Sequence, residues 1–184
     1  NSLIKTREHF GEGEKMFKRV WPEFTTEDDP NLPGTKGGSA SGTGFFVDDE
    51  GHIITNYHVI APCNNKQKII YNNKEFNAKL IAKDKQLDLA LLKVSVNNKH
   101  FIKITNKPIR KLQSIIAAGY PGGKALSDDL KFTSGIISSL KGPGNNSAII
   151  QIDAALNPGN SGGPIVDKEN GNLAGVAVAG LRKD

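Results

Sequence analysis

Three residues of the chain are of the types that together make a serine reactive. His58 follows one short apolar run, Asp88 precedes another, and Ser161 lies in the turn-rich segment NPGNSGGPIV, residues 157–166. Nucleophilic acyl transfer needs a hydroxyl, a base that removes its proton, and a carboxylate that fixes the tautomer of that base. Taken singly, the three residues also fit a surface histidine, a turn former and a polar turn. Their joint appearance supplies the parts of a nucleophilic site.

The residues around Ser161 favour an unusual backbone conformation. Gly159 precedes the serine by two positions, and Gly162 and Gly163 follow it directly. Glycine accepts positive φ and lets another backbone or a ligand come close. We therefore expect Ser161 to be presented by a turn rather than packed in a core.

Composition is that of an ordinary globular chain of 184 residues, enough for one large domain or two small ones. No stretch approaches the roughly 18 consecutive apolar residues of a membrane span, so we expect no membrane insertion. The net charge of +5 arises from 24 basic and 19 acidic side chains, without a basic stripe interleaved with aromatics. Nucleic-acid binding is therefore not expected.

The cysteine count and the first 30 residues limit the possible disulfides, metal sites and targeting signals. Cys63 is the only cysteine, which excludes an internal disulfide and leaves no thiol pair for zinc. We expect no metal and no cofactor. Residues 1–30 carry charges throughout, so no signal peptide is visible.

From Gly44 onward, short β-rich runs alternate with turn signals such as Asn170-Gly171. No segment after residue 40 keeps a 3.6-residue apolar period over three turns, which argues against parallel βαβ units. The spacing predicts an antiparallel all-β fold, a barrel or a sandwich, with little helix. The expected strands are 44–47, 52–55, 68–71, 75–82, 89–94, 114–119, 132–139, 148–152, 164–166 and 173–180.

The beginning of the chain differs from the rest. Over residues 3–20, four apolar side chains fall loosely on one helical face, and a Pro- and Gly-rich connector follows. We expect residues 1–41 to form an N-terminal appendage and connector, and residues 42–184 to form the main domain.

The three motifs together resemble those of a known family. The segments TNYHVI (55–60), DLALLKV (88–94) and GNSGGPIV (159–166) are similar to the signature regions of trypsin-fold serine proteases. The stretch Gly42–Gly180 resembles the HtrA/Deg branch, most specifically in QIDAALNPGNSGGPIV, residues 151–166. This resemblance implies two six-stranded antiparallel β-barrels packed together, with the catalytic cleft between them.

The resemblance also implies roles for individual residues. Ser161 would be the nucleophile, His58 the general base and then acid, and Asp88 the residue that orients His58. The backbone N–H groups of Gly159 and Ser161 would form the oxyanion hole. The implied function is a serine endopeptidase that hydrolyses unfolded or damaged polypeptides through an acyl-enzyme.

The residues that match the primary specificity pocket are small and uncharged. Ala155, six positions before Ser161, would line its base, and Val178, Ala179 and Gly180 would form its wall. A lysine or arginine before the scissile bond would be buried there without a partner. We therefore expect a preference for small aliphatic residues.

Six other residues are interpreted individually. Asn160 stands where digestive trypsins carry an aspartate that pairs with a newly cut N-terminus, so activation by N-terminal cleavage is not expected. Cys63 lacks a glycine turn and is interpreted as a buried structural thiol rather than a nucleophile. Asp153 is assigned a structural hydrogen bond. His52, like His9 and His100, is expected to face solvent.

The chain also departs from the family pattern. It ends four residues past Gly180, so we expect the C-terminal end of the protease domain to be incomplete in this stretch, which holds no PDZ domain. The connection 141–147 is short for regulation through such a domain. The resemblance further implies a homo-oligomer, a trimer, in the periplasm or cell envelope. Two alternatives stay open: a non-catalytic trypsin-fold binding or chaperone module, and a basic binding protein of unrelated all-β fold.

Overall fold

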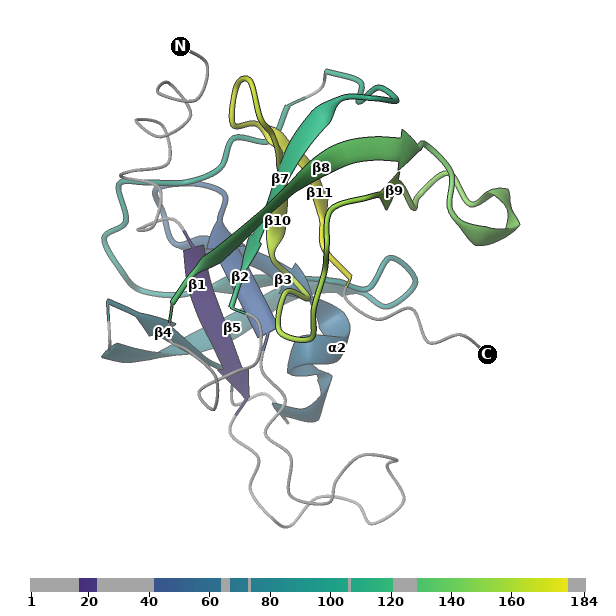
Figure 1. The fold of residues 1–184 in the computed structure, drawn as a ribbon. Coiled ribbons are helices and arrows are strands. Elements are labelled where there is room, and N and C mark those ends of the chain that lie inside the picture. Colours follow the sequence, from purple (N-terminus) through teal and green to yellow (C-terminus); the bar gives the residue numbers. More distant parts are fainter. Residues whose placement is uncertain are drawn as a thin grey trace.

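Antiparallel β-strands make up nearly all of the regular structure, and they form a closed barrel and an open sheet (Figure 1). The computed structural model describes residues 17–22, 42–63, 67–72, 74–105, 107–120 and 129–178. The barrel comes from the first half of the described chain and the open sheet from the second.

The barrel closes because its first strand pairs on both sides. β1 is antiparallel to β2 through the pair Lys18↔Gly44, and to β4 through the pair Val20↔Ile69. The strands follow the order β1-β2-β3-β6-β5-β4. Their bounds are β1 (Phe17–Pro22), β2 (Gly42–Phe46), β3 (His52–Asn56), β4 (Gln67–Tyr71), β5 (Lys74–Asp84) and β6 (Leu89–Lys93).

The second sheet has five strands in the order β11-β10-β7-β8-β9. Their bounds are β7 (Ser114–Gly119), β8 (Lys131–Ser139), β9 (Gln151–Ile152), β10 (Pro164–Asp167) and β11 (Leu173–Val176). Each pairing is antiparallel, and a bulge interrupts the register of β10 with β11 and of β8 with β9. The two-sheet all-β architecture is therefore confirmed, but the described residues form a five-stranded second sheet and not a second closed six-stranded barrel.

Helix is as scarce as the sequence predicts. The described residues contain one α-helical turn, α2 (Tyr57–Ile60), and two 3-10 turns, η2 (Ala61–Cys63) and η3 (Pro143–Asn145). Within these ranges no helix is long and apolar enough to cross a membrane.

Each of the ten runs expected to be a strand from residue 44 onward overlaps an observed strand. The prediction is wrong at the start of the chain, because residues 17–20, part of the segment with a loosely helical apolar face, belong to β1. The remainder of 3–20 lies outside the described residues. The boundary between appendage and main domain at residue 42 stays a prediction. β1 precedes that boundary in the sequence and is nevertheless a strand of the barrel.

Neighbouring side chains of β2 build two different cores. Phe46 is fully buried inside the barrel, in a cluster with Ile53, Ile69 and Leu92. Phe45, pointing to the opposite face of the strand, packs in a second cluster with Ile116 and Val166 and others from the second sheet. The alternation along this strand therefore ties the barrel to the second sheet.

We expect Leu92→Ala to lower the free energy of unfolding by about 2–5 kcal/mol, because Leu92 is fully buried in the barrel core and its truncation leaves a cavity there. Urea unfolding followed by tryptophan fluorescence or circular dichroism measures the change. The matched control is Leu112→Ala at a side chain that is 75% exposed, where a change within about 0.5 kcal/mol is expected. Equal losses in the two variants would contradict this description of the core.

Candidate active site

His58 and Asp88 are joined by two hydrogen bonds. The main-chain N–H of His58 donates to Asp88 Oδ1 at 2.8 Å, and the imidazole Nδ1 lies 2.6 Å from Oδ2. Because an ionised carboxylate only accepts, Nδ1 carries the proton, and Nε2 of the neutral ring keeps its lone pair. The His58 side chain is 50% exposed and that of Asp88 is 28% exposed. The arrangement gives an oriented imidazole with one nitrogen available as a base.

Strand register brings these two residues together across the sequence. β3 pairs with β6 so that Asn56, the last residue of β3, faces Leu89, the first of β6. Asp88 directly precedes β6, and its carbonyl accepts from the Tyr57 N–H at 3.1 Å and from Asn56 Nδ2 at 2.9 Å. Its φ of 55° lies in the left-handed region, which aspartate tolerates better than most residues. The end of the β3–β6 ladder therefore fixes the backbone on both sides of the pair.

The turn that carries Ser161 is held by its own backbone hydrogen bonds. The N–H groups of Asn160, Gly162 and Gly163 donate to Asn157, Ala177 and Asn160 carbonyls at 2.9, 2.9 and 2.8 Å. Gly159 and Gly162 have φ values of 100° and 82°, as the glycine pattern predicts. The N–H of Gly159, in contrast, donates to no residue of the described ranges.

Ser161 lies in a turn, as expected, but it is packed rather than presented, because the residue is only 5% exposed. The turn packs tightly on the barrel. A Cβ at Gly162 would lie 2.3 Å from both the Thr43 carbonyl oxygen and Thr55 Oγ1. Glycine is thus required at this position for close approach as well as for positive φ.

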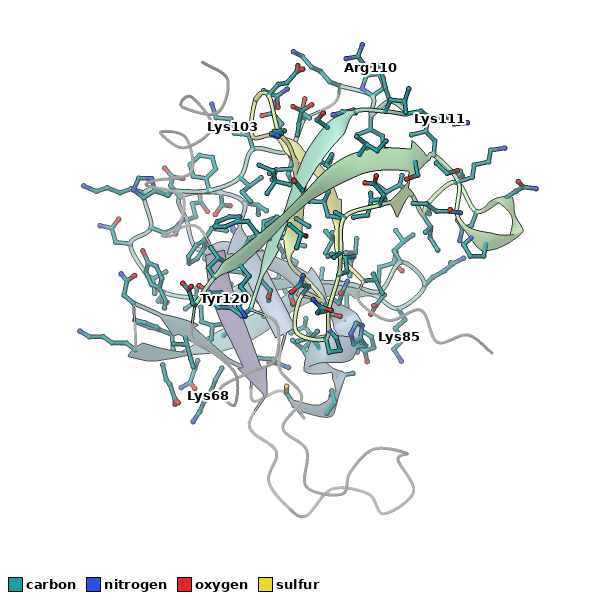
Figure 2. The ribbon with its side chains drawn as sticks, in the orientation of Figure 1. Lys68, Lys85, Lys103, Arg110, Lys111 and Tyr120 are labelled. Carbon is teal, nitrogen blue, oxygen red and sulfur yellow. The ribbon has the colours of Figure 1, made fainter. Side chains whose placement is uncertain are left out.

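Thr43 is the principal contact between the serine turn and the barrel. Its N–H donates to the Ser161 carbonyl at 2.8 Å, and its Oγ1 donates to the Gly159 carbonyl at 2.8 Å. The same Oγ1 accepts from the N–H of Tyr120, which follows β7 and is labelled in Figure 2, at 3.0 Å. The Thr43 carbonyl accepts from Thr55 Oγ1 at 2.7 Å. Thr43 is completely buried, so water does not reach these groups.

Sequence reasoning missed Thr43. The available signal was a hydroxyl residue between two glycines in GTGFF, inside a run that otherwise becomes apolar. A buried polar side chain in a strand must find hydrogen-bond partners, and here those partners lie on the serine turn.

The serine turn and α2 lie side by side (Figure 1). A Cβ on Gly42 would meet Val59 Cγ1 at 2.5 Å and the Ser161 carbonyl oxygen at 3.1 Å. Val59 is the residue after His58. The segments that carry the predicted base and the predicted nucleophile therefore pack against the same glycine.

Two of the residues expected to line a specificity pocket lie in the described ranges. Ala155 is exposed, and its carbonyl accepts a hydrogen bond from Thr133 Oγ1 at 2.9 Å. Val178, two residues after β11, is 40% exposed. Ala179 and Gly180 lie outside the described residues.

Two secondary predictions, for Asp153 and Cys63, agree with the structure, and the expectation drawn from Asn160 about activation stays a prediction. Asp153 has the expected structural role, since its Oδ1 accepts from the Ile136 N–H at 2.6 Å. Cys63 is buried as expected, and burial raises the pKa of its thiol to about 11. Asn160 is 3% exposed, and its Oδ1 has no hydrogen-bond partner among the residues described.

The prediction that His52 faces solvent is wrong. It is half-buried, and its Nδ1 lies 2.5 Å from Asp48 Oδ2. Asp48 Oδ1 also accepts from the main-chain N–H groups of Glu50 and His52, each at 3.0 Å. Burial opposes ionisation of Asp48, but the hydrogen bonds from His52 and Glu50 outweigh it and lower the pKa of this carboxyl. The pair braces the turn between β2 and β3. His100 is also half-buried, and His9 lies outside the described residues.

We expect Thr43→Val to lower the free energy of unfolding by about 1–3 kcal/mol, because the Gly159 carbonyl and the Tyr120 N–H lose their buried partner. Thr43→Ser keeps the hydroxyl and should lose less. The control is Thr105→Val, whose Oγ1 accepts from the Lys107 N–H in an exposed segment. Chemical unfolding of the three variants measures the differences, and wild-type stability of Thr43→Val would refute the role given to this side chain.

The chain is similar to proteins of one family in sequence. A model described as the trypsin-like peptidase domain matches residues 42–176. The chain is 36% identical over 152 residues to an uncharacterised protein, y4bJ, of Sinorhizobium fredii, covering 83% of this chain and 24% of that protein. It is 35% identical over 149 residues to protease Do-like 1, chloroplastic, of Arabidopsis thaliana, covering 76% of this chain and 33% of that protein. A probable periplasmic serine endoprotease, DegP-like, of Brucella suis is 34% identical over 153 residues, covering 80% of this chain and 29% of that protein.

Solved structures give the same assignment. A serine endoprotease from Yersinia pestis superposes with a TM-score of 0.71 at 28% identity, over 93% of this chain and 56% of that chain. An HtrA-type protease with a tripeptide superposes with a TM-score of 0.72 at 28% identity, over 93% of this chain and 53% of that chain. The chain spans 24% to 33% of the length of these curated relatives. It belongs to the trypsin-like peptidase domain family, and within that family to the HtrA/Deg type of serine protease.

Proposed function

We propose that this domain is a serine endopeptidase in which Ser161, His58 and Asp88 form the catalytic triad. The observation that carries the proposal is the double contact of His58 with Asp88, through the main-chain N–H at 2.8 Å and the imidazole at 2.6 Å. It holds the imidazole in the tautomer that leaves Nε2 ready to accept a proton.

Each residue then has one chemical task. Ser161 Oγ attacks the carbonyl carbon of a peptide bond while His58 Nε2 takes its proton. The protonated imidazole, stabilised by Asp88, gives this proton to the leaving amine as the C–N bond breaks. Water deprotonated by His58 then hydrolyses the ester at Ser161, and the serine recovers its proton.

The N–H groups of Gly159 and Ser161 are the proposed donors to the negative oxygen of the tetrahedral intermediate. Support comes from the Gly159 N–H, which donates to no described residue, and from the bonds that hold the neighbouring peptide units of the turn. Loss of one such donor typically removes about 2.7–4 kcal/mol of transition-state stabilisation.

Substrate preference is proposed from the residues that match the pocket. Ala155 and Val178 are exposed and apolar, and Ala179 and Gly180 complete the expected wall. A recess without a carboxylate favours valine, alanine or isoleucine before the scissile bond. Because such side chains are buried in folded proteins, the proposed substrates are unfolded or damaged polypeptides.

Cellular location is proposed from the relatives alone. The Brucella suis relative is named periplasmic, and we infer the cell envelope for this domain. The homo-oligomer implied by the family resemblance stays a prediction.

We expect a fluorophosphonate probe to label the wild-type chain and not Ser161→Ala, because only an assembled triad and oxyanion hole make the serine reactive. Asp88→Asn should lower turnover of an unfolded protein substrate by about 10⁴-fold. The matched control, Ser147→Ala at an exposed serine, should be labelled like the wild type. An unlabelled but folded wild-type chain would identify the alternative, a non-catalytic binding or chaperone module.

Cleavage sites in a reduced, unfolded protein, mapped by mass spectrometry, test the pocket. We expect most cuts to follow valine, alanine or isoleucine. Ala155→Asp should increase the share of cuts after lysine and arginine, because it supplies a carboxylate for their charge. A majority of wild-type cuts after lysine or arginine would refute the pocket assignment without affecting the triad.

A further inference from the structure

Two lysine side chains converge on the ring of Tyr57, the residue that precedes His58. Lys83 Nζ lies 5.3 Å from the ring centroid, and Lys85 Nζ lies 5.8 Å from it. Both lysines are exposed, and Tyr57 is half-buried. Ammonium groups at this distance are attracted by the negative face of an aromatic ring, so the Tyr57 ring interacts with both positive charges.

No described carboxylate forms an ion pair with either ammonium group. Ion pairs among the described residues include His52–Asp48, His58–Asp88, Lys68–Glu75 and Lys93–Glu50. The two acidic residues nearest in sequence have other partners. Asp84 Oδ1 accepts from the N–H groups of Gln86 and Leu87, and Asp88 holds His58. A carboxylate that reached either ammonium group would gain an ionic partner that the described residues do not supply.

The lysines border the proposed catalytic residues. Lys83 pairs with Ala90, one pair before the end of the β5–β6 ladder, and the turn that carries Lys85 ends at Asp88. The Tyr57 N–H donates to the Asp88 carbonyl at 3.1 Å, which fixes Tyr57 beside this turn. Figure 2 shows Lys85 on the side of the molecule where α2 lies. Both ammonium groups therefore lie against the ring of the residue that precedes the proposed base, beside the turn that ends at Asp88.

We propose that Tyr57, Lys83 and Lys85 form an accessory substrate subsite that binds a glutamate or aspartate side chain a few residues from the scissile bond. The subsite rests on the proposed function, since it selects among polypeptides that His58 and Ser161 cleave. It adds a charged requirement to the apolar one at Ala155. Its contribution depends on salt, because exposed charges are screened.

The test uses peptides acetylated and amidated at their ends, so that the single test side chain is the only carboxylate. Each peptide carries valine at the cleavage position, and glutamate replaces glutamine at one flanking position at a time. The measured quantity is the ratio of kcat/KM for each glutamate peptide to that of its glutamine twin, at low and at high salt. For the wild type we expect a ratio of about 3–20 at one or two adjacent positions, falling as salt rises.

Lys83→Gln with Lys85→Gln should bring this ratio close to about 1, because the glutamate loses both cations. The matched control is Lys79→Gln, an exposed lysine on the same strand without a ring contact, which should keep the wild-type ratio. A wild type without any glutamate preference, or a double variant that keeps it, would overturn the proposal.

Failure of the proposed function gives a different result. In that case the wild type hydrolyses none of the peptides and resists the fluorophosphonate probe. Fluorescence anisotropy of labelled glutamate and glutamine peptides then measures binding directly. Tighter binding of a glutamate peptide, lost in the double lysine variant, supports the subsite, and equal binding of the twins refutes it.

Discussion

Thr43 makes hydrogen bonds through its N–H, its hydroxyl and its carbonyl; the N–H and the hydroxyl hold the serine turn against the barrel, and the carbonyl accepts from Thr55 inside the barrel. The first two bind the carbonyls of Ser161 and Gly159, and the hydroxyl also receives the N–H of Tyr120 beyond β7. Barrel, second sheet and serine turn therefore meet at one buried side chain. Hydrogen bonds in such a dry place are strong and expensive to leave unmade. The contact holds the carbonyls of Gly159 and Ser161, and with them the peptide units on both sides of the turn.

His58 is positioned by a different set of contacts. The antiparallel register of β3 and β6 sets Asp88 opposite the start of α2, and both the main chain and the ring of His58 bind its carboxylate. Backbone hydrogen bonds thus position the base, as they position the serine turn. Gly42 lies against both Val59 and the Ser161 carbonyl, so the histidine segment and the serine turn contact each other at this glycine. A side chain there would separate them.

Sequence alone predicted what depends on local pattern. Strand runs with turn signals, the glycines at positive φ, and the types of His58, Asp88 and Ser161 are all readable along the chain. It missed what depends on contacts across the fold. Thr43 and Gly159 are 116 positions apart, so their hydrogen bond leaves no local trace. Barrel closure decided the state of residues 17–20, whose apolar spacing is loose enough to fit either a helix or a strand.

The candidate site combines two environments that respond differently to change. The turn of Ser161 is buried and its hydrogen bonds contribute to folding, so substitutions there affect stability and geometry together. Lys83 and Lys85 are exposed, and exposed charges contribute little to stability. Their positions can therefore vary without loss of the fold, while they still alter the potential that an approaching polypeptide meets. Substrate selection by charge can change on this rim independently of the geometry that Thr43 maintains beneath it.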